Sequence, residues 1–153
     1  MSATGLEVFD KTLHTTNTWL DQIMADLGPD PKIAWHALGA VLHALRDRVP
    51  IGLAVHLGAQ LPLLVRGLYY DQWRPKEEPA RFRSADEFLA YVQEGLKGIR
   101  PVNAADAAQA VLRVINHYVD PNEVAKVPNS LPDPIRKLWP EAGSAAHQTH
   151  SAA

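Results

Sequence analysis

Cysteine is missing from all 153 positions of the chain. Its absence excludes a disulfide scaffold, a thiolate zinc site, a cysteine nucleophile and a Cys-x-x-Cys redox pair, and it fits a reducing compartment. Long uncharged apolar runs are missing too, because the best candidate, Val49 to Val65, is interrupted by two prolines, a histidine and a glutamine. The start, MSATGLEVFDK, has neither a basic segment nor a long apolar core, which argues against a signal peptide. We therefore expect a cytoplasmic protein that does not engage a membrane.

An excess of charge of one sign is also lacking. The formal net charge is −2 and the pI is about 6.4, whereas a nucleic-acid-binding domain commonly has a pI above about 9. We therefore expect no nucleic-acid partner. The length is that of one domain, or of two small halves that share a core.

The motifs of several enzyme and metalloprotein classes are absent. The sequence contains no Glu-x-x-His pair, no Gly-x-Ser-x-Gly nucleophile motif and no Gly-x-x-x-x-Gly-Lys phosphate loop. His36 and His43 are seven residues apart, which places them about 10 Å apart along a helix and too far apart for one metal ion. We expect no catalytic residue, no metal site and no cofactor, although an enzyme of unrecognised type stays open.

Helical signals, in contrast, recur along the whole chain. The clearest is Lys32–Val49, whose apolar residues form one stripe at helical spacing. Asp-Pro and Ser-x-x-Glu sequences supply the start signals of later helices. These patterns predict an all-α fold with helices over Leu6–Leu27, Lys32–Val49, Ile51–Leu57, Pro62–Tyr70, from Ser84, from Asn103 or Asp106 to Tyr118, and from Asp120.

The chain also resembles itself at an offset of about 70 residues. Residues 35–69 and 105–139 align without a gap and are identical at nine of 35 positions, among them Leu61-Pro62 over Leu131-Pro132. The matches fall on the expected inward faces, as a duplicated fold requires. We predict two tandem three-to-four-helix repeats packed into one bundle: residues 1–70, a linker over 71–84, residues 85–140, and a disordered tail over 141–153.

Three stretches together carry a family resemblance: ALRDRVPIGLAVHLGAQLPLLVRGLYYDQWRP, then DEFLAYVQEGL, then LPDPIRKLWP. With them the chain resembles the domain of unknown function 2267 family of small bacterial helical proteins, over roughly Gly5 to Pro140. The resemblance implies an all-α fold of duplicated character. It implies no catalytic or binding residue, because no activity is established for the family.

The connection DQWRPKEEPARFRS, Asp71 to Ser84, is long for a compact domain. It interleaves basic and aromatic residues, but acidic residues offset their charge, so a solvated linker with internal ion pairs and an acidic protein partner are both open. Tyr69 has a counterpart, Trp139, in the second repeat and is expected to be structural. Tyr70 and Trp73 have no such counterpart, and together with the nearby arginines Arg74, Arg81 and Arg83 they form the candidate interaction surface. The alternative is that these rings bridge the two halves.

The leading hypothesis is a non-catalytic protein-interaction or regulatory module, with an unknown protein partner or a second copy of the chain. The second hypothesis is a binder of an apolar small molecule or cofactor between the two repeats. The third is an enzyme of a type that the sequence does not reveal.

Overall fold

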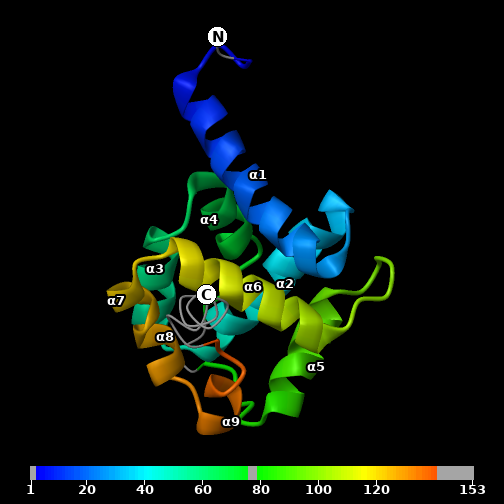
Figure 1. Cartoon of the computed structure of the whole chain (residues 1–153). Coiled ribbons are helices and arrows are strands. Elements are labelled where there is room, and N and C mark those ends of the chain that lie inside the picture. The colour runs from blue at the N-terminus through cyan, green and yellow to red at the C-terminus, as the bar shows by residue number, and fades with distance from the viewer. Residues whose placement is uncertain (1–2, 76–78, 141–153) are drawn as a thin grey trace, which may run out of the picture.

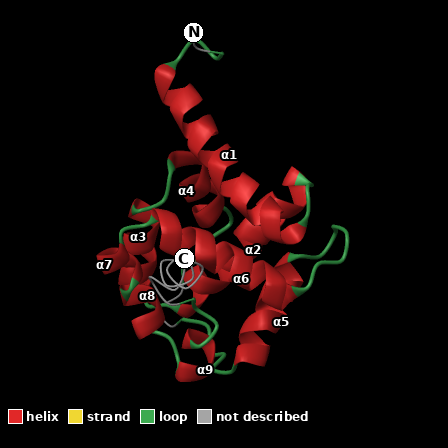
Figure 2. Cartoon of the chain, viewed as in Figure 1, coloured by secondary structure: helices red, strands yellow, loops and turns green. Residues whose placement is uncertain are grey.

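The computed structural model describes residues 3–75 and 79–140, and this part of the chain contains helices and loops but no strand (Figure 2). The predicted all-α class is confirmed. The predicted tail, residues 141–153, lies outside the described residues. In chain order the helices are α1 (Glu7–Leu27), α2 (Pro31–Arg48), α3 (Ile51–Ala59), α4 (Leu63–Tyr70), α5 (Ala85–Gly95), α6 (Ala104–Tyr118), α7 (Pro121–Val124), α8 (Lys126–Asn129) and α9 (Asp133–Arg136) (Figure 1).

Local capping chemistry explains where the main helices begin. The carboxylate of Asp30 accepts a hydrogen bond of 2.9 Å from a backbone N–H in the first turn of α2. Ser84 and Glu87 form a reciprocal capping box at the start of α5. The sequence left two starts open for α6, and the structure selects Asn103, whose side chain accepts a hydrogen bond of 3.0 Å from the Asp106 N–H.

Helix α2 lies at the centre of the fold and packs against α1, α3, α4, α5 and α6. Its small residues permit this crowding. Gly95 of α5 approaches so closely that a methyl group there would stand 2.9 Å from the Cβ of Ala40. Because α2 is covered on most sides, residues from both halves of the chain join one hydrophobic core around it.

Only the second half of α1 belongs to this core. Trp19 and Ile23 are buried, and the Trp19 ring stacks on Tyr118 of α6 with centroids 5.7 Å apart. The first half projects from the body (Figure 1), and its apolar residues Phe9 and Leu13 are exposed. Neither α1 nor any other helix of residues 3–75 and 79–140 is long and apolar enough to span a membrane.

The two Leu-Pro steps have the same local structure. Leu61 and Leu131 are buried, and the proline after each is extended, with ψ of 156° before α4 and 149° before α9. In each case an arginine of the following helix donates a hydrogen bond to the leucine carbonyl, at 3.0 Å from Arg66 and 3.3 Å from Arg136. Both leucines face inward, as the alignment of the two stretches predicted, since the extended proline turns each leucine back into the core.

The end of the connection between α4 and α5 is held against α2, whereas Gln72, Arg74, Arg81 and Arg83 of the same connection are exposed. The N–H of Ala80 donates a hydrogen bond of 2.7 Å to the Asp47 carbonyl, and Arg48 Nε donates one of 2.7 Å to the Phe82 carbonyl. Phe82 is 8% exposed and contacts the ring of Phe88. Residues 79–82 therefore pack along α2, held by one apolar side chain, one backbone hydrogen bond and one hydrogen bond from the Arg48 side chain.

A polar contact joins α3 to α7. His56 is hydrogen-bonded to the carboxylate of Glu123, which also pairs with Lys126 at 3.1 Å. The hydrogen bonds from His56 and then from Lys126 lower the pKa of Glu123 below its ordinary value. A carboxyl group whose pKa is lowered in the folded state stabilises the fold when it is ionised.

Glu123→Gln should lower the melting temperature, Tm, near neutral pH and have little effect in acid. The stabilisation is fully present above the ordinary pKa of 4.5 and is lost as the pH falls through the lowered folded-state pKa. Thermal unfolding of both proteins between about pH 3 and pH 7 measures this. The control is Glu94→Gln, which removes a well-exposed ion pair with Lys97. A Tm difference that is constant across the pH range would contradict the assignment.

Candidate functional site

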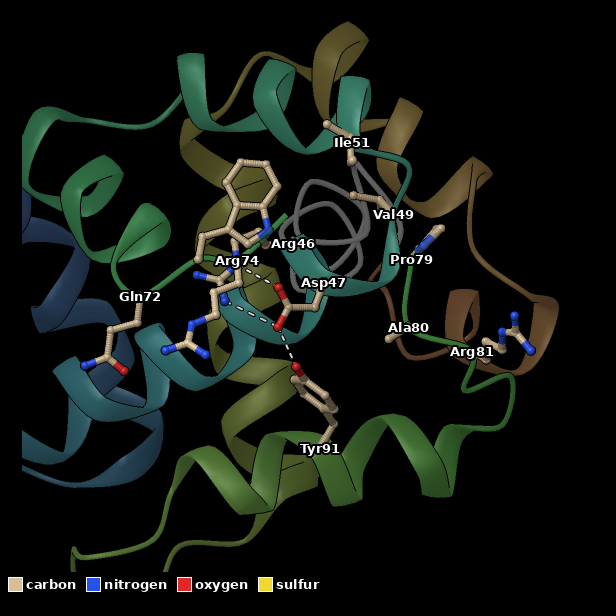
Figure 3. Close-up of a pocket in the computed structure, with 11 residues that line it drawn as sticks. Arg46, Asp47, Val49, Ile51, Gln72, Arg74, Pro79, Ala80, Arg81 and Tyr91 are labelled. Atoms are coloured by element: carbon tan, nitrogen blue, oxygen red, sulfur yellow. Dashed lines mark hydrogen bonds and ion pairs between the residues drawn. The ribbon is translucent and has the colours of Figure 1, made fainter. Parts of the chain in front are cut away.

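A pocket of about 540 Å³ opens where the connection after α4 crosses α2 and faces α5 (Figure 3). We call it the seam pocket. In this view Arg74 and Arg81 lie on opposite sides of it, and Ile51 lies above. Its walls are Arg46, Asp47, Val49, Ile51, Gln72, Trp73, Arg74, Pro79, Ala80, Arg81 and Tyr91.

The inner wall of the pocket is a hydrogen-bonded polar cluster. Arg46 is 6% exposed, and its guanidinium donates to both carboxylate oxygens of Asp47, at 2.8 and 3.3 Å. Its Nη1 also donates to the carbonyls of Tyr69, at 2.8 Å, and Asp71, at 3.0 Å. From α5, the Tyr91 hydroxyl donates to Asp47. One buried cation therefore joins α2 to the end of α4 and, through its carboxylate partner, to α5.

Burial, together with the hydrogen bond to Asp47, raises the pKa of Tyr91 to about 12. The phenol therefore stays protonated and remains a donor across the physiological range. Nearby, His43 Nε2–H donates a hydrogen bond of 2.7 Å to the Leu68 carbonyl, and burial lowers the pKa of His43. Both side chains thus take part in hydrogen bonds that join α2 to α5 and to α4.

Aromatic rings lead from the core to the pocket. Tyr69 is fully buried, its hydroxyl donates a hydrogen bond of 2.6 Å to the Ala54 carbonyl, and burial raises its pKa. Tyr70 meets Tyr69 edge to face at 5.0 Å and stacks on Trp73 at 5.6 Å. Trp73 is half-buried, and the guanidinium carbon of Arg46 lies 5.9 Å from its ring centroid. The structural role predicted for Tyr69 is confirmed.

The structure brings three of the predicted surface residues together: Trp73, Arg74 and Arg81 all line the seam pocket. Tyr70 lies behind Trp73, and its hydroxyl donates a hydrogen bond of 3.2 Å to the Val55 carbonyl. Arg83 is exposed but does not line the pocket.

Sequence reasoning missed other residues that line the pocket, above all Arg46, Asp47 and Tyr91. Arg46 and Asp47 lie off the apolar stripe of α2, a position typical of solvent-facing residues. They are enclosed because α4, α5 and the connection cover that side of α2 as well. No local signal reports such covering, because it depends on segments at least 23 positions further along the chain.

A second pocket, of about 530 Å³, lies on the other side of the Arg46–Asp47–Tyr91 wall. Its additional walls include Trp35, His36 and the carboxylate residues Asp71 and Glu94. The wall thus separates a basic pocket from an acidic one. Within the residues that the structure describes, no group of three or more His, Cys, Asp or Glu side chains is placed to hold a metal ion.

These features define an all-helical protein with one core and a surface pocket where the connection crosses the central helix. Residues 16–138 match the model of the family described as "Uncharacterized conserved protein (DUF2267)". The match spans most of the chain, so the protein belongs to the domain of unknown function 2267 family, and the predicted resemblance is confirmed. No curated protein matches the chain.

Arg46→Ala should destabilise the fold by about 3–5 kcal/mol, because it leaves a carboxylate and two carbonyls without their buried donor. The measurement is chemical denaturation of the variant and the wild type. Arg113→Ala is the matched control, since it removes an exposed guanidinium that pairs with Asp26 at 2.9 Å, and it should cost less than about 1 kcal/mol. Equal losses from both variants would show that Arg46 does not hold the wall together.

Gly58→Ala should displace Tyr70 and destabilise the fold by about 1–3 kcal/mol. A Cβ at Gly58 would stand 2.2 Å from the Tyr70 hydroxyl oxygen. In contrast, Gly67→Ala introduces a methyl group with nothing within 4 Å, and should be neutral or stabilising. Thermal unfolding measures both. In a Tyr70→Ala background the cost of Gly58→Ala should disappear, and an undiminished cost there would contradict the steric explanation.

Proposed function

We propose that the protein is a non-catalytic interaction module of the cytoplasm, which binds a partner protein at the seam pocket. The observation that carries the proposal is the joint exposure, at one pocket, of a half-buried indole, an aliphatic side chain and a guanidinium. These belong to Trp73, to Ile51, which is 39% exposed, and to Arg74. Tryptophan and arginine are the residues that most often dominate binding energy at protein interfaces.

The polar groups of the pocket wall are hydrogen-bonded to one another, which supports a binding role over a catalytic one. Asp47 is neutralised by Arg46 and hydrogen-bonded by Tyr91. A general base needs a carboxylate or imidazole with an accessible lone pair near the reacting atom. The Asp47 oxygens instead accept hydrogen bonds from Arg46 and Tyr91, and these bonds hold the wall of the pocket in place.

The inferred duplication accounts for the position of this site. We infer that residues 1–70 and 85–140 are two repeats joined by 71–84, and the shared geometry of the two Leu-Pro steps supports this. Residues 71–75 follow only the first repeat, because the second reaches Pro140 at the equivalent point. Six of the eleven described residues that line the seam pocket lie in the connection, which only the first repeat has. This is expected for a function added to a duplicated fold.

Site-specific photo-cross-linking tests the proposal. Benzoylphenylalanine in place of Ile51, which lines the pocket, should yield a discrete cross-linked product in the native host. The same residue in place of Leu63, which is 53% exposed but lies outside the pocket, is the control. Trp73→Ala should reduce the product from position 51 by more than about tenfold if Trp73 is an interface hot spot.

Each outcome has a defined meaning. A product of twice the chain's mass would identify a second copy as the partner. Equal products from both positions, or a yield unaffected by Trp73→Ala in a folded variant, would contradict the proposal. A small molecule found by mass spectrometry of the purified protein, with no cross-linked protein, would favour the alternative of a ligand binder.

A further inference from the structure

The proposed function leaves the chemistry of the partner open, and the charge around the seam pocket specifies it. We propose, on the basis of that function, that the pocket receives an acidic segment of a partner protein. In this complex an apolar side chain of the segment rests on Trp73 and Ile51, and a neighbouring carboxylate pairs with Arg74.

Charge is the first support. The described residues lining the pocket carry three guanidinium groups and one carboxylate. Arg46 and Asp47 pair at 2.8 Å and neutralise each other, and Arg81 has interactions of its own, so the charge that faces a partner is that of the exposed Arg74. Over residues 71–84 the sequence has four basic and three acidic side chains, so the connection as a whole carries a net positive charge. A carboxylate brought to Arg74 gains a charge-assisted hydrogen bond.

The second support is an indole donor without an acceptor. The Trp73 Nε1–H has no hydrogen-bond partner among residues 3–75 and 79–140. The indole of Trp139, by comparison, donates to Asn116 at 2.6 Å. Trp73 and Arg74 both line the pocket, so the indole N–H is a second hydrogen-bond donor there, next to the Arg74 guanidinium. Two donors beside an apolar face match a carboxylate that follows or precedes a large apolar residue.

The neighbouring pocket confines the acidic segment to this side of the wall. Asp71 and Glu94 line that pocket, and Glu94 also pairs with Lys97 at 2.8 Å, which leaves Asp71 as the carboxylate that opposes an acidic chain most directly. Like charges placed together oppose binding, so an acidic chain that crosses the wall is disfavoured. A nucleic acid would meet the same carboxylates while gaining few phosphate contacts from two arginines. A short acidic peptide stretch fits the charge pattern better than a long polyanion.

Peptide binding tests the inference directly. The probes are fluorescein-labelled dodecapeptides in which a central leucine or phenylalanine is flanked by glutamates, with lysine-for-glutamate isomers as the matched control. Fluorescence anisotropy at low salt should detect the glutamate peptides and not the lysine isomers. The Kd should rise with salt, because the attraction is screened. Binding by both charge types, or by no glutamate peptide, would overturn the inference.

Variants of the full chain locate the contact. Arg74→Glu and Trp73→Ala should each raise the Kd by at least about tenfold. Arg74→Gln should have a smaller effect, and Asp71→Asn should leave the Kd unchanged or lower it. Arg113→Glu makes the same charge change on α6 and should alter the Kd less than about twofold. Circular dichroism of each variant shows whether it is folded.

The cross-linking and peptide-binding experiments together distinguish a failure of the acidic-segment inference from a failure of the proposed interaction function. If cross-linking at position 51 captures a partner but Arg74→Glu leaves that capture and peptide binding unchanged, the acidic-segment inference fails and the interaction function stands. If both cross-linking and peptide binding fail, the interaction function fails as well. A polyuridine oligonucleotide that binds more tightly than every peptide, with the same dependence on Arg74, would overturn the inference in favour of nucleic acid.

Discussion

The site depends on the hydrogen bonds and the ion pair of the buried Arg46 guanidinium. A charge that is 6% exposed is tolerated only when its donors are satisfied and a counter-charge is close. Asp47 supplies that charge at 2.8 Å, and the carbonyls at the end of α4 take the remaining bonds. Because these requirements are directional, they determine how the end of α4 sits on α2. Hydrophobic packing alone would leave that arrangement less well defined.

The seam pocket follows from this constraint. Once the Asp71 carbonyl is held on Arg46, the chain must turn at once to reach Trp73, and Gln72 adopts a φ of 57°, a left-handed conformation uncommon outside glycine. The turn places the Trp73 ring against Tyr70, whose position in turn requires the missing side chain of Gly58. The exposed surface of the pocket therefore rests on a connected set of internal contacts, and such preorganisation favours the binding that we propose.

The same wall separates opposite charges. Arg74 and Arg81 border one pocket, and Asp71 and Glu94 border the other, with the neutralised Arg46–Asp47 pair between them. Residues only a few positions apart in the connection thus contribute to pockets of opposite sign. A molecule of net charge −2 can in this way present a local surface that attracts acidic groups. Net charge describes solubility and long-range attraction, whereas local arrangement selects the partner.

The helices up to α7, the Asp30 and Ser84 caps and the inward-facing leucines of the Leu-Pro steps could be predicted from the sequence, because each depends on residues within a few positions of one another. The helices α8 and α9 and the choice of Asn103 as the α6 cap could not. The unusual composition of the connection also led to Trp73, Arg74 and Arg81 as candidate surface residues, and all three line the seam pocket. Tertiary packing alone buries Phe82, leaves Arg83 outside the pocket and makes Arg46, Asp47 and Tyr91 its wall. Those outcomes depend on which distant segment covers each face of α2, and a side chain's own spacing carries no information about that covering.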